Sequence, residues 1–145
     1  MDNTDIKTIQ WFPGHMAKTR RAITANLKLV DVVVELIDAR TPMSSRNPEI
    51  DRLTSSKPRM VLLNKCDLAD DKATAAWVNW FRRENVDALA VDCKSGKGLN
   101  KLMPTIKSTV LKELMDKRQR AGMTGAPVRM MILGIPNVGK SSLIN

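Results

Sequence analysis

Residues 134–141 read Gly134-Ile135-Pro136-Asn137-Val138-Gly139-Lys140-Ser141, which is the pattern G-x-x-x-x-G-K-[ST]. An apolar run from Val128 to Leu133 comes directly before it and predicts a buried strand. In a strand–loop–helix context, the backbone N–H groups of such a loop surround phosphate oxygens. The sequence therefore predicts a phosphate-binding loop in an α/β fold.

The side chains of this loop have separate expected roles. Lys140 is expected to neutralise the outer phosphates, and the hydroxyl of Ser141 is expected to ligate Mg²⁺. The full set that we expect to contact a nucleotide in this loop is Asn137, Val138, Gly139, Lys140, Ser141 and Ser142.

Three further apolar runs predict buried strands, namely Val30 to Ile37, Arg59 to Leu63 and Val86 to Val91. Helical patterns separate them. These are the stripe Met16, Arg20, Ile23 and Leu27, a helix start at Asn47-Pro48-Glu49, the stripe Ala73, Ala76, Trp77, Trp80 and Phe81, and the stripe Leu99, Leu102, Met103, Ile106, Val110 and Leu114. Pro104 lies inside the last stripe and predicts a kink or a later helix start.

Alternating strands and helices predict a parallel sheet covered on both faces, a three-layer α/β/α sandwich of the P-loop NTPase type. By analogy with that fold, the last strand should lie beside the first, followed by the second and third. The edge next to Val128–Leu133 is then expected to be unpaired, with a risk of association. The aromatic stripe Trp77, Trp80 and Phe81 is expected to pack in the core rather than to stack on RNA bases.

Composition favours a cytosolic chain with a polyanionic partner. The 145 residues, enough for one domain, hold 24 Lys or Arg against 15 Asp or Glu, a net charge of +9. Such a charge favours RNA as a partner, although many small domains are simply basic. The cluster Lys94, Lys97 and Lys101 either grips phosphates or merely solvates a helix start. Two cysteines and one histidine form neither a disulfide framework nor a standard zinc site, and no run suggests a leader or a membrane span.

A second motif, Asn64-Lys65-Cys66-Asp67, follows the second apolar run. The carboxylate of Asp67 can accept hydrogen bonds from N1–H and the exocyclic amine of guanine, a donor pair that adenine lacks. The stem of Lys65 can lie over the base, and Asn64 can tie this turn to the phosphate loop. Alternatively, this is an ordinary turn in which Asp67 caps the next helix.

A third segment, Asp92 to Leu99, follows the third apolar run and contains Gly96 and Gly98. Here the N–H of Cys93, next to Lys94, is placed to donate to guanine O6. The alternative is a glycine-rich entry into a helix. Because the carboxyl ends of parallel strands meet at one edge, the three motifs are expected to converge on a guanine nucleotide.

The order of these motifs, with Trp11-Phe12-Pro13-Gly14-His15-Met16 and Asp38-Ala39-Arg40 before them, resembles the circularly permuted GTPases of the ribosome biogenesis GTPase A type. That resemblance implies GTP hydrolysis, GTP or GDP and Mg²⁺ as ligands, and the precursor of the large ribosomal subunit and its rRNA as partners. It implies His15 as the residue that orients the attacking water, although His15 could instead anchor a turn. It implies that Asn137 supports a K⁺ ion, and it adds Lys140 as a catalytic residue.

The chain departs from that family by ending at Asn145 without any D-x-x-G motif. We therefore expect residues 1–145 to be an incomplete, circularly permuted GTP-binding domain, with an N-terminal segment and helix over 1–28 and a linker over 120–127. The short helix left after the phosphate loop should fray, and hydrolysis should be near zero in this chain alone. We expect a monomer, cytoplasmic and associated with ribosomes, without a membrane or DNA as partner.

Two other functions remain open at this stage. One is a non-catalytic module that binds rRNA or the ribosome through its basic surface. The other is an ATP-using P-loop protein, in which Asn64 to Asp67 have no role in base recognition.

Overall fold

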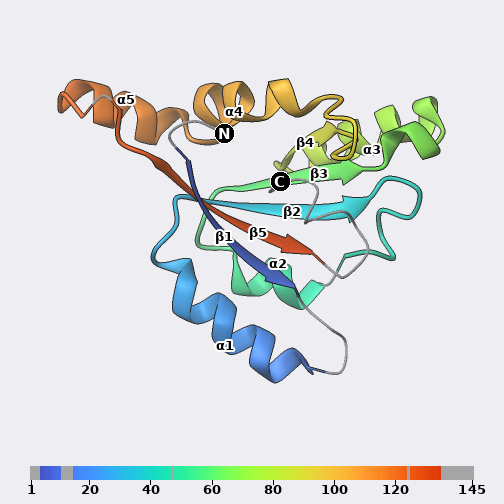
Figure 1. The fold of residues 1–145 in the computed structure, drawn as a ribbon, viewed down its shortest axis with the longest axis horizontal. Coiled ribbons are helices and arrows are strands. Elements are labelled where there is room, and N and C mark those ends of the chain that lie inside the picture. The colour runs from blue at the N-terminus through green and yellow to red at the C-terminus, as the bar shows by residue number, and fades with distance from the viewer. Residues whose placement is uncertain (1–3, 11–14, 47, 124, 135–145) are drawn as a thin grey trace.

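The computed structural model describes residues 4–10, 15–46, 48–123 and 125–134. At its centre is a five-stranded sheet in the order β1-β5-β2-β3-β4, in which all paired strands are parallel (Figure 1). The strands are β1 (Thr4–Gln10), β2 (Val32–Asp38), β3 (Arg59–Asn64), β4 (Asp87–Ala90) and β5 (Val128–Gly134). The expected order of the last four strands is confirmed, and the α/β class with it.

One face of the sheet is covered by α1 (Met16–Leu27), α2 (Pro48–Leu53) and α3 (Asp71–Arg83). In β1, β2, β3 and β5 the odd-numbered residues point to this face, whereas in β4 it is Ala88 and Ala90 that do so. Ile23 of α1 and Ile50 of α2 pack with Val33, and Phe81 of α3 packs with Ile37. Trp77 and Trp80 surround Phe81 in this layer, with ring centroids 6.4 and 5.1 Å away, so the aromatic stripe belongs to the core as expected.

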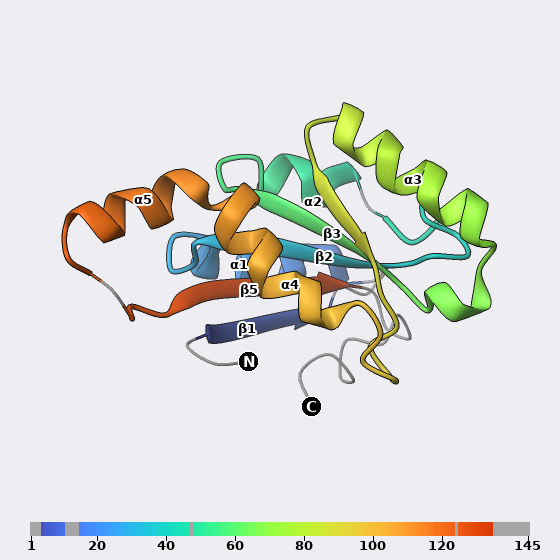
Figure 2. The same ribbon diagram turned by 90° about the horizontal axis from the view of Figure 1, so that it is seen from above.

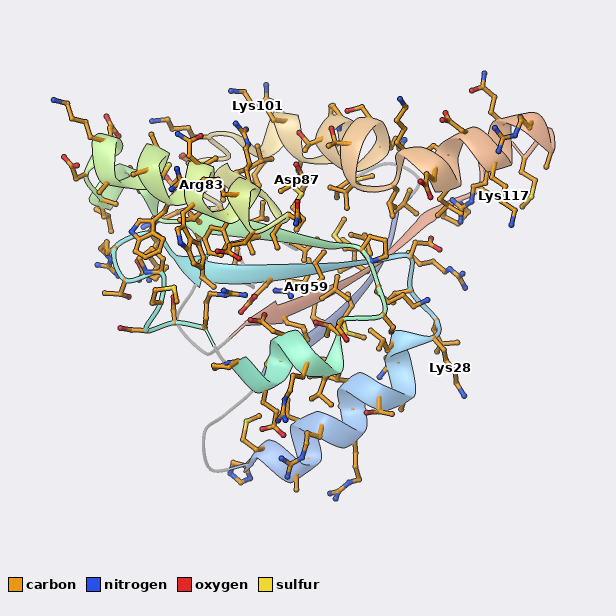
Figure 3. All side chains as sticks on the ribbon, turned by 180° about the vertical axis from the view of Figure 1, so that it is seen from behind. Lys28, Arg59, Arg83, Asp87, Lys101 and Lys117 are labelled. Carbon is orange, nitrogen blue, oxygen red and sulfur yellow. The ribbon has the colours of Figure 1, made fainter. Side chains whose placement is uncertain are left out.

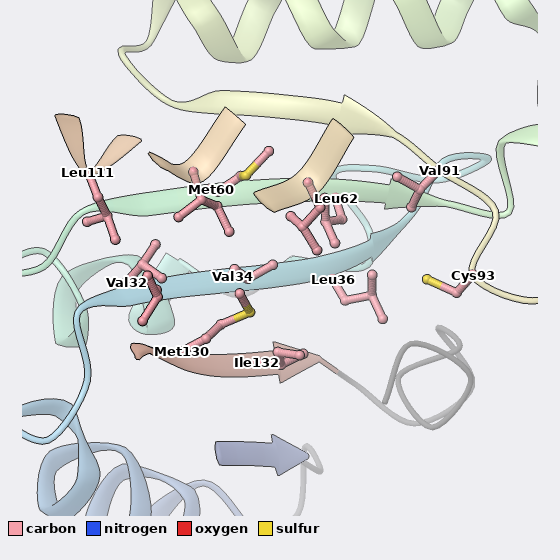
Figure 4. Close-up of a cluster of buried hydrophobic side chains, with 13 residues drawn as sticks. Val32, Val34, Leu36, Met60, Leu62, Val91, Cys93, Leu111, Met130 and Ile132 are labelled. Carbon is pink, nitrogen blue, oxygen red and sulfur yellow. The ribbon is translucent and has the colours of Figure 1, made fainter. Parts of the chain in front are cut away.

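The opposite face is covered by one irregular helical run, composed of η3 (Leu99–Lys101), α4 (Leu102–Thr105), η4 (Ile106–Val110) and α5 (Lys112–Arg120). Even-numbered strand residues such as Val34 and Met60 pack beneath it (Figure 4). Figure 2 shows α4 crossing over the strands and α5 continuing away from them. The sheet thus lies between two helical layers, which confirms the predicted sandwich.

The run is irregular on both sides of Pro104, which lies in the short helix α4 between η3 and η4. Proline has no N–H, so it cannot complete an intrahelical bond. One turn later η4 is a π-turn, in which the Leu111 N–H donates to the Ile106 carbonyl at 2.7 Å. The Ser108 hydroxyl donates to the Pro104 carbonyl at 2.7 Å. The run therefore bends over the sheet while keeping Leu102, Ile106 and Leu111 buried.

Asp31 joins the starts of β2 and β5, which are far apart in the sequence. Its N–H donates to the Arg129 carbonyl at 2.7 Å, and its Oδ2 accepts from the Arg129 N–H at 2.8 Å. Arg118 of α5 donates to the same oxygen at 3.2 Å. One carboxylate thus holds β2, β5 and α5 together.

The expectation of an unpaired edge beside β5 is wrong, because β1 pairs with β5 along its whole length, from Thr4–Val128 to Gln10–Gly134. The segment 4–10 does not look like a buried strand, since it contains only two apolar residues. Those two suffice, because Ile6 packs against the α4 side and Ile9 against the α1 side.

Among the described residues, no helix is long and apolar enough to cross a membrane.

Deleting residues 1–10 should lower the thermal unfolding midpoint and cause self-association, because it exposes the polar backbone of β5. Light scattering coupled to size-exclusion chromatography measures the association, and circular dichroism measures the midpoint. Deletion of residues 1–3 alone is the matched control. A monomer of unchanged midpoint after the longer deletion would show that β1 does not protect this edge.

Candidate functional site

The edge formed by the carboxyl ends of the strands has a step in it. Leu133 of β5 is opposite Glu35 of β2, so Gly134 is level with Leu36, while β2 and β3 continue to the pair Asp38–Asn64. The step is about two residues, or roughly 7 Å, deep. Across the edge, Gly134 and Asn64 are separated by two strand spacings, roughly 10 Å. Gly134 thus lies at the same sheet edge as the ends of β2 and β3, as a shared nucleotide site requires.

The turn after β3, residues 64–67, is held by backbone bonds from both neighbouring strands. The Ala39 N–H donates to the Asn64 carbonyl at 2.8 Å, and the Cys66 N–H donates to the Val91 carbonyl at 3.1 Å. Lys65 lies between them in the left-handed region, with φ of 61°. A non-glycine residue there costs about 1–2 kcal/mol, and such positions concentrate at functional sites.

Asp67 does not cap the helix that follows, so the plain alternative for this residue is wrong. The cap of α3 is Asp70, whose carboxylate accepts from the Ala73 N–H at 2.9 Å. Asp67 is exposed at the rim of the sheet edge. Its carboxylate is therefore available for a ligand.

Asn64 joins this turn to the next one along the edge. It is 2% exposed, and its Oδ1 accepts a hydrogen bond from the Cys93 N–H at 2.9 Å. The predicted contact between that N–H and guanine O6 remains a prediction, and it requires the N–H to be shared between Asn64 and the base. The neighbouring Lys94 N–H points to Asp92 Oδ1 at 3.3 Å.

Gly98 lets this second turn fold back against β4. Its φ is +83°, and an added Cβ would lie 2.5 Å from the Ala90 carbonyl oxygen. The Asp92 N–H donates to the Lys97 carbonyl at 2.9 Å, and the hydrogen bond from Ser95 lowers the pKa of the Asp92 carboxyl. The turn is therefore closed on itself with its lysines, Lys94 and Lys97, exposed.

The turn after β2 carries a bidentate ion pair. Arg40 donates through Nε and Nη2 to the two oxygens of Asp38, at 3.0 and 2.7 Å. This guanidinium lowers the pKa of Asp38, and the charge of Lys65 acts in the same direction. The Ser45 hydroxyl closes the loop, since it accepts from the Asp38 N–H at 3.0 Å and donates to the Thr41 carbonyl at 2.9 Å.

Beneath this loop lies a partly buried cluster of four charges that the sequence analysis missed. Arg46 and Arg59 each approach Asp51 Oδ1 at 2.6 Å and Glu35 Oε1 at 3.4 and 3.5 Å. Arg46 also lies 5.1 Å from the centre of the Phe81 ring. Burial raises the pKa of Glu35, whose other oxygen has no hydrogen-bond partner in the described part of the chain. The cluster ties the loop after β2 to α2, α3 and β3.

The remaining predicted site residues cannot be placed in this way. The predicted phosphate-loop residues lie outside the described part of the chain; they are Asn137, Val138, Gly139, Lys140, Ser141 and Ser142. The predicted convergence of Asp67 and Lys140 and the predicted fraying of the last helix therefore stay predictions. His15 is described and exposed at the start of α1. Its carbonyl accepts from the Thr19 hydroxyl at 3.1 Å. No group of three metal-ligating side chains occurs among the residues that the structure describes.

A cavity of about 390 Å³ lies next to the Asn64–Asp67 turn, between α3 and the end of β4. Cys66, Thr74, Ala90 and Lys97 contribute to its lining. Asn64, Lys65 and Asp67, which are the residues predicted to recognise the base in this turn, do not line it.

Comparisons with known proteins agree with this geometry. The chain is 53% identical over 137 residues to a protein of Bacillus licheniformis named ribosome biogenesis GTPase A, and the match covers 94% of this chain and 48% of that protein. Mitochondrial ribosome-associated GTPase 1 of Bos taurus is 37% identical over 139 residues, covering 94% of this chain and 40% of that protein. A search against protein-family models found no match.

Among solved structures, GNP-bound YlqF from T. maritima matches with a TM-score of 0.61 and 33% identity, over 88% of this chain and 46% of that one. Its GDP-bound form matches with a TM-score of 0.60. The resemblance to the ribosome biogenesis GTPase A family is thereby confirmed, and the chain spans about half the length of the relatives it matches.

Replacing Arg46 by Ala should reduce the free energy of unfolding by about 3 kcal/mol, because Glu35 would then be buried with only its weaker contact to Arg59. Urea denaturation measures the change. Arg52→Ala, a change at an exposed arginine on the same helix layer, should stay within about 0.5 kcal/mol of the parent. Equal effects of the two substitutions would contradict a structural role for the cluster.

The two cysteines at this edge should react slowly with disulfide reagents in the folded chain. Burial raises the pKa of Cys66, and it raises the pKa of Cys93 to about 11. At pH 8 the thiolate of Cys93 is then about 100-fold scarcer than at the ordinary cysteine pKa. Ellman's reagent should therefore react at least about tenfold faster after unfolding in urea, and equal rates would contradict the burial of the two thiols.

Proposed function

We propose that this chain, a homologue of proteins named ribosome biogenesis GTPase A over nearly all of its length, is part of a GTPase that acts in assembly of the large ribosomal subunit. The observation that carries the proposal is the position of the Asn64–Asp67 turn. It lies at the same sheet edge as Gly134, where the G-x-x-x-x-G-K-[ST] pattern begins, and its carboxylate is not used to cap α3.

Base recognition falls to the two turns that Asn64 joins. Asp67 accepts hydrogen bonds from N1–H and the exocyclic amine of guanine, and the stem of Lys65 covers the base plane. The backbone of Cys93 and Lys94 faces O6. Because wrong-base binding would leave a desolvated carboxylate unpaired, the site discriminates against adenine.

GTP and GDP are the proposed ligands, with Lys140 at the outer phosphates and Ser141 as the ligand of Mg²⁺. The nucleotide-bound YlqF structures support this choice of ligand. When bound, Mg²⁺ would offset negative charge on the phosphates. We further propose that Asn137 supports a K⁺ ion and that His15 orients the attacking water.

The proposed partners are the precursor of the large ribosomal subunit and its rRNA, met in the cytoplasm as a ribosome-associated monomer. The names of the relatives support a ribosomal partner. The net charge of +9 supports RNA as part of it. The pairing of β1 with β5, which covers one side of β5, supports a monomer.

Replacing Asp67 by Asn should weaken GTP binding by about 10–100-fold, because the bidentate contact to the base is lost. Binding of xanthosine triphosphate should improve, since xanthine presents an acceptor where guanine carries its amine. Titration with fluorescent GTP, XTP and ATP analogues measures all three affinities.

Asp71→Asn is the matched control, since it makes the same chemical change at an exposed position in the first turn of α3. It should leave all three affinities unchanged. If Asp67→Asn kept the parent's preference for guanine, an ATP-using protein would be the better interpretation.

A further inference from the structure

The α4–α5 layer carries most of the net charge of the chain. The segment 94–120 contains eight Lys or Arg residues and two acidic residues, which gives +6 of the total +9. The outer side of this layer has no other described element on it (Figures 1 and 2). We call the exposed cations Lys101, Lys107, Lys112, Lys117 and Arg120 the lysine surface.

None of the four lysines of this surface forms an ion pair within 4 Å in the described part of the protein. The ion pairs identified there are made by arginines such as Arg46, Arg59 and Arg118. Arginines suit internal pairs because their planar fork matches a carboxylate, whereas a lysine is a hydrated point charge on a flexible stem. The cations of these ion pairs are thus arginines, and the lysine surface presents an excess of positive charge to solvent.

The length and residue types of this surface indicate what it contacts. Residues 99–120 span about 33 Å if they rise as an α-helix does. That length follows about ten phosphates along one strand of a duplex. No Phe, Trp or Tyr occurs between residues 94 and 120, so the surface offers no aromatic platform for unstacked bases. A partner held by its phosphate backbone fits these features better than a single strand held by stacking.

We propose that the lysine surface binds double-stranded RNA through the phosphate backbone, without reading its sequence. The choice of RNA over other polyanions rests on the proposed function in ribosome assembly. One end of the surface adjoins the turn of Lys94 and Lys97, which also belongs to the base site, and the other end is the tip of α5. Figure 3 shows Lys101 and Lys117 along this layer and Lys28 on the opposite layer.

The test replaces Lys101, Lys107, Lys112 and Lys117 together by Gln and leaves Lys94 and Lys97 unchanged, since Lys94 belongs to the proposed nucleotide site. Fluorescence anisotropy with a labelled 24-base-pair RNA duplex should show binding at least about tenfold weaker than for the parent chain. The slope of log affinity against log salt concentration should fall by about 3, because each lost phosphate contact removes roughly 0.7–0.9. Circular dichroism checks that the variant is folded.

The matched control replaces four exposed cations of the opposite layer, Lys18, Arg21, Lys28 and Arg52, by Gln. It makes the same change in net charge and should keep affinity within about twofold of the parent. Equal losses in both variants, or a loss in neither, would overturn the proposal. Tighter binding of oligouridine than of the duplex would overturn it too, as would competition by polyglutamate as strong as by RNA, which would indicate an acidic protein as partner.

Nucleotide titration of the same variants separates this inference from the proposed function. The lysine variant should bind GTP as the parent does, since none of its four changes lies in the base turns. If neither the parent chain nor any variant bound GTP, the proposed function would be wrong. The duplex measurements would still test whether the lysine surface binds RNA.

Discussion

The insertion of β5 between β1 and β2 is the constraint on which the rest of this structure depends. Asp31 secures it where the two strands begin, by exchanging hydrogen bonds with the backbone of Arg129 and accepting one from Arg118. The pairing brings the last described strand of the chain to the interior of a sheet whose other strands come from residues 4–90. Without it, the phosphate-loop pattern and the turn at Asn64 would not share an edge.

The edge combines a rigid backbone with side chains that are available to a ligand. Backbone bonds from Ala39 and Cys66, together with the buried amide of Asn64, fix the turns after β2, β3 and β4 to one another. The carboxylate of Asp38 is already paired with Arg40, whereas Asp67 is exposed at the rim. This difference between two nearby carboxylates follows from their partners and is the physical basis for assigning base recognition to Asp67.

Much of the fold could be predicted from the sequence, because the inner strands appear there as short runs that are apolar on both faces. Since these runs alternate with helical patterns, they also predict a parallel sheet. The edge strand β1 could not be found in this way, since Ile6 and Ile9 are its only apolar residues and each faces a different layer. The motif at Asn64 could be predicted, but its alternative at Asp67 could be rejected only when Asp70 was seen to cap α3. The cluster of Glu35, Arg46, Asp51 and Arg59 could not be predicted, because no local sequence pattern indicates ion pairs between residues on different elements.

The two basic residue types have different roles in the described part of the fold. A lysine in place of Arg46 could not both reach two carboxylates in a fixed fork and lie over the Phe81 ring in the same way. An arginine in place of an exposed lysine would add a planar guanidinium, which donates paired hydrogen bonds to base edges and carboxylates. Its contacts would therefore be more selective than those of an ammonium group. On the lysine surface, mobile ammonium groups suit the proposed contact with phosphates of any sequence, because they do not select base edges.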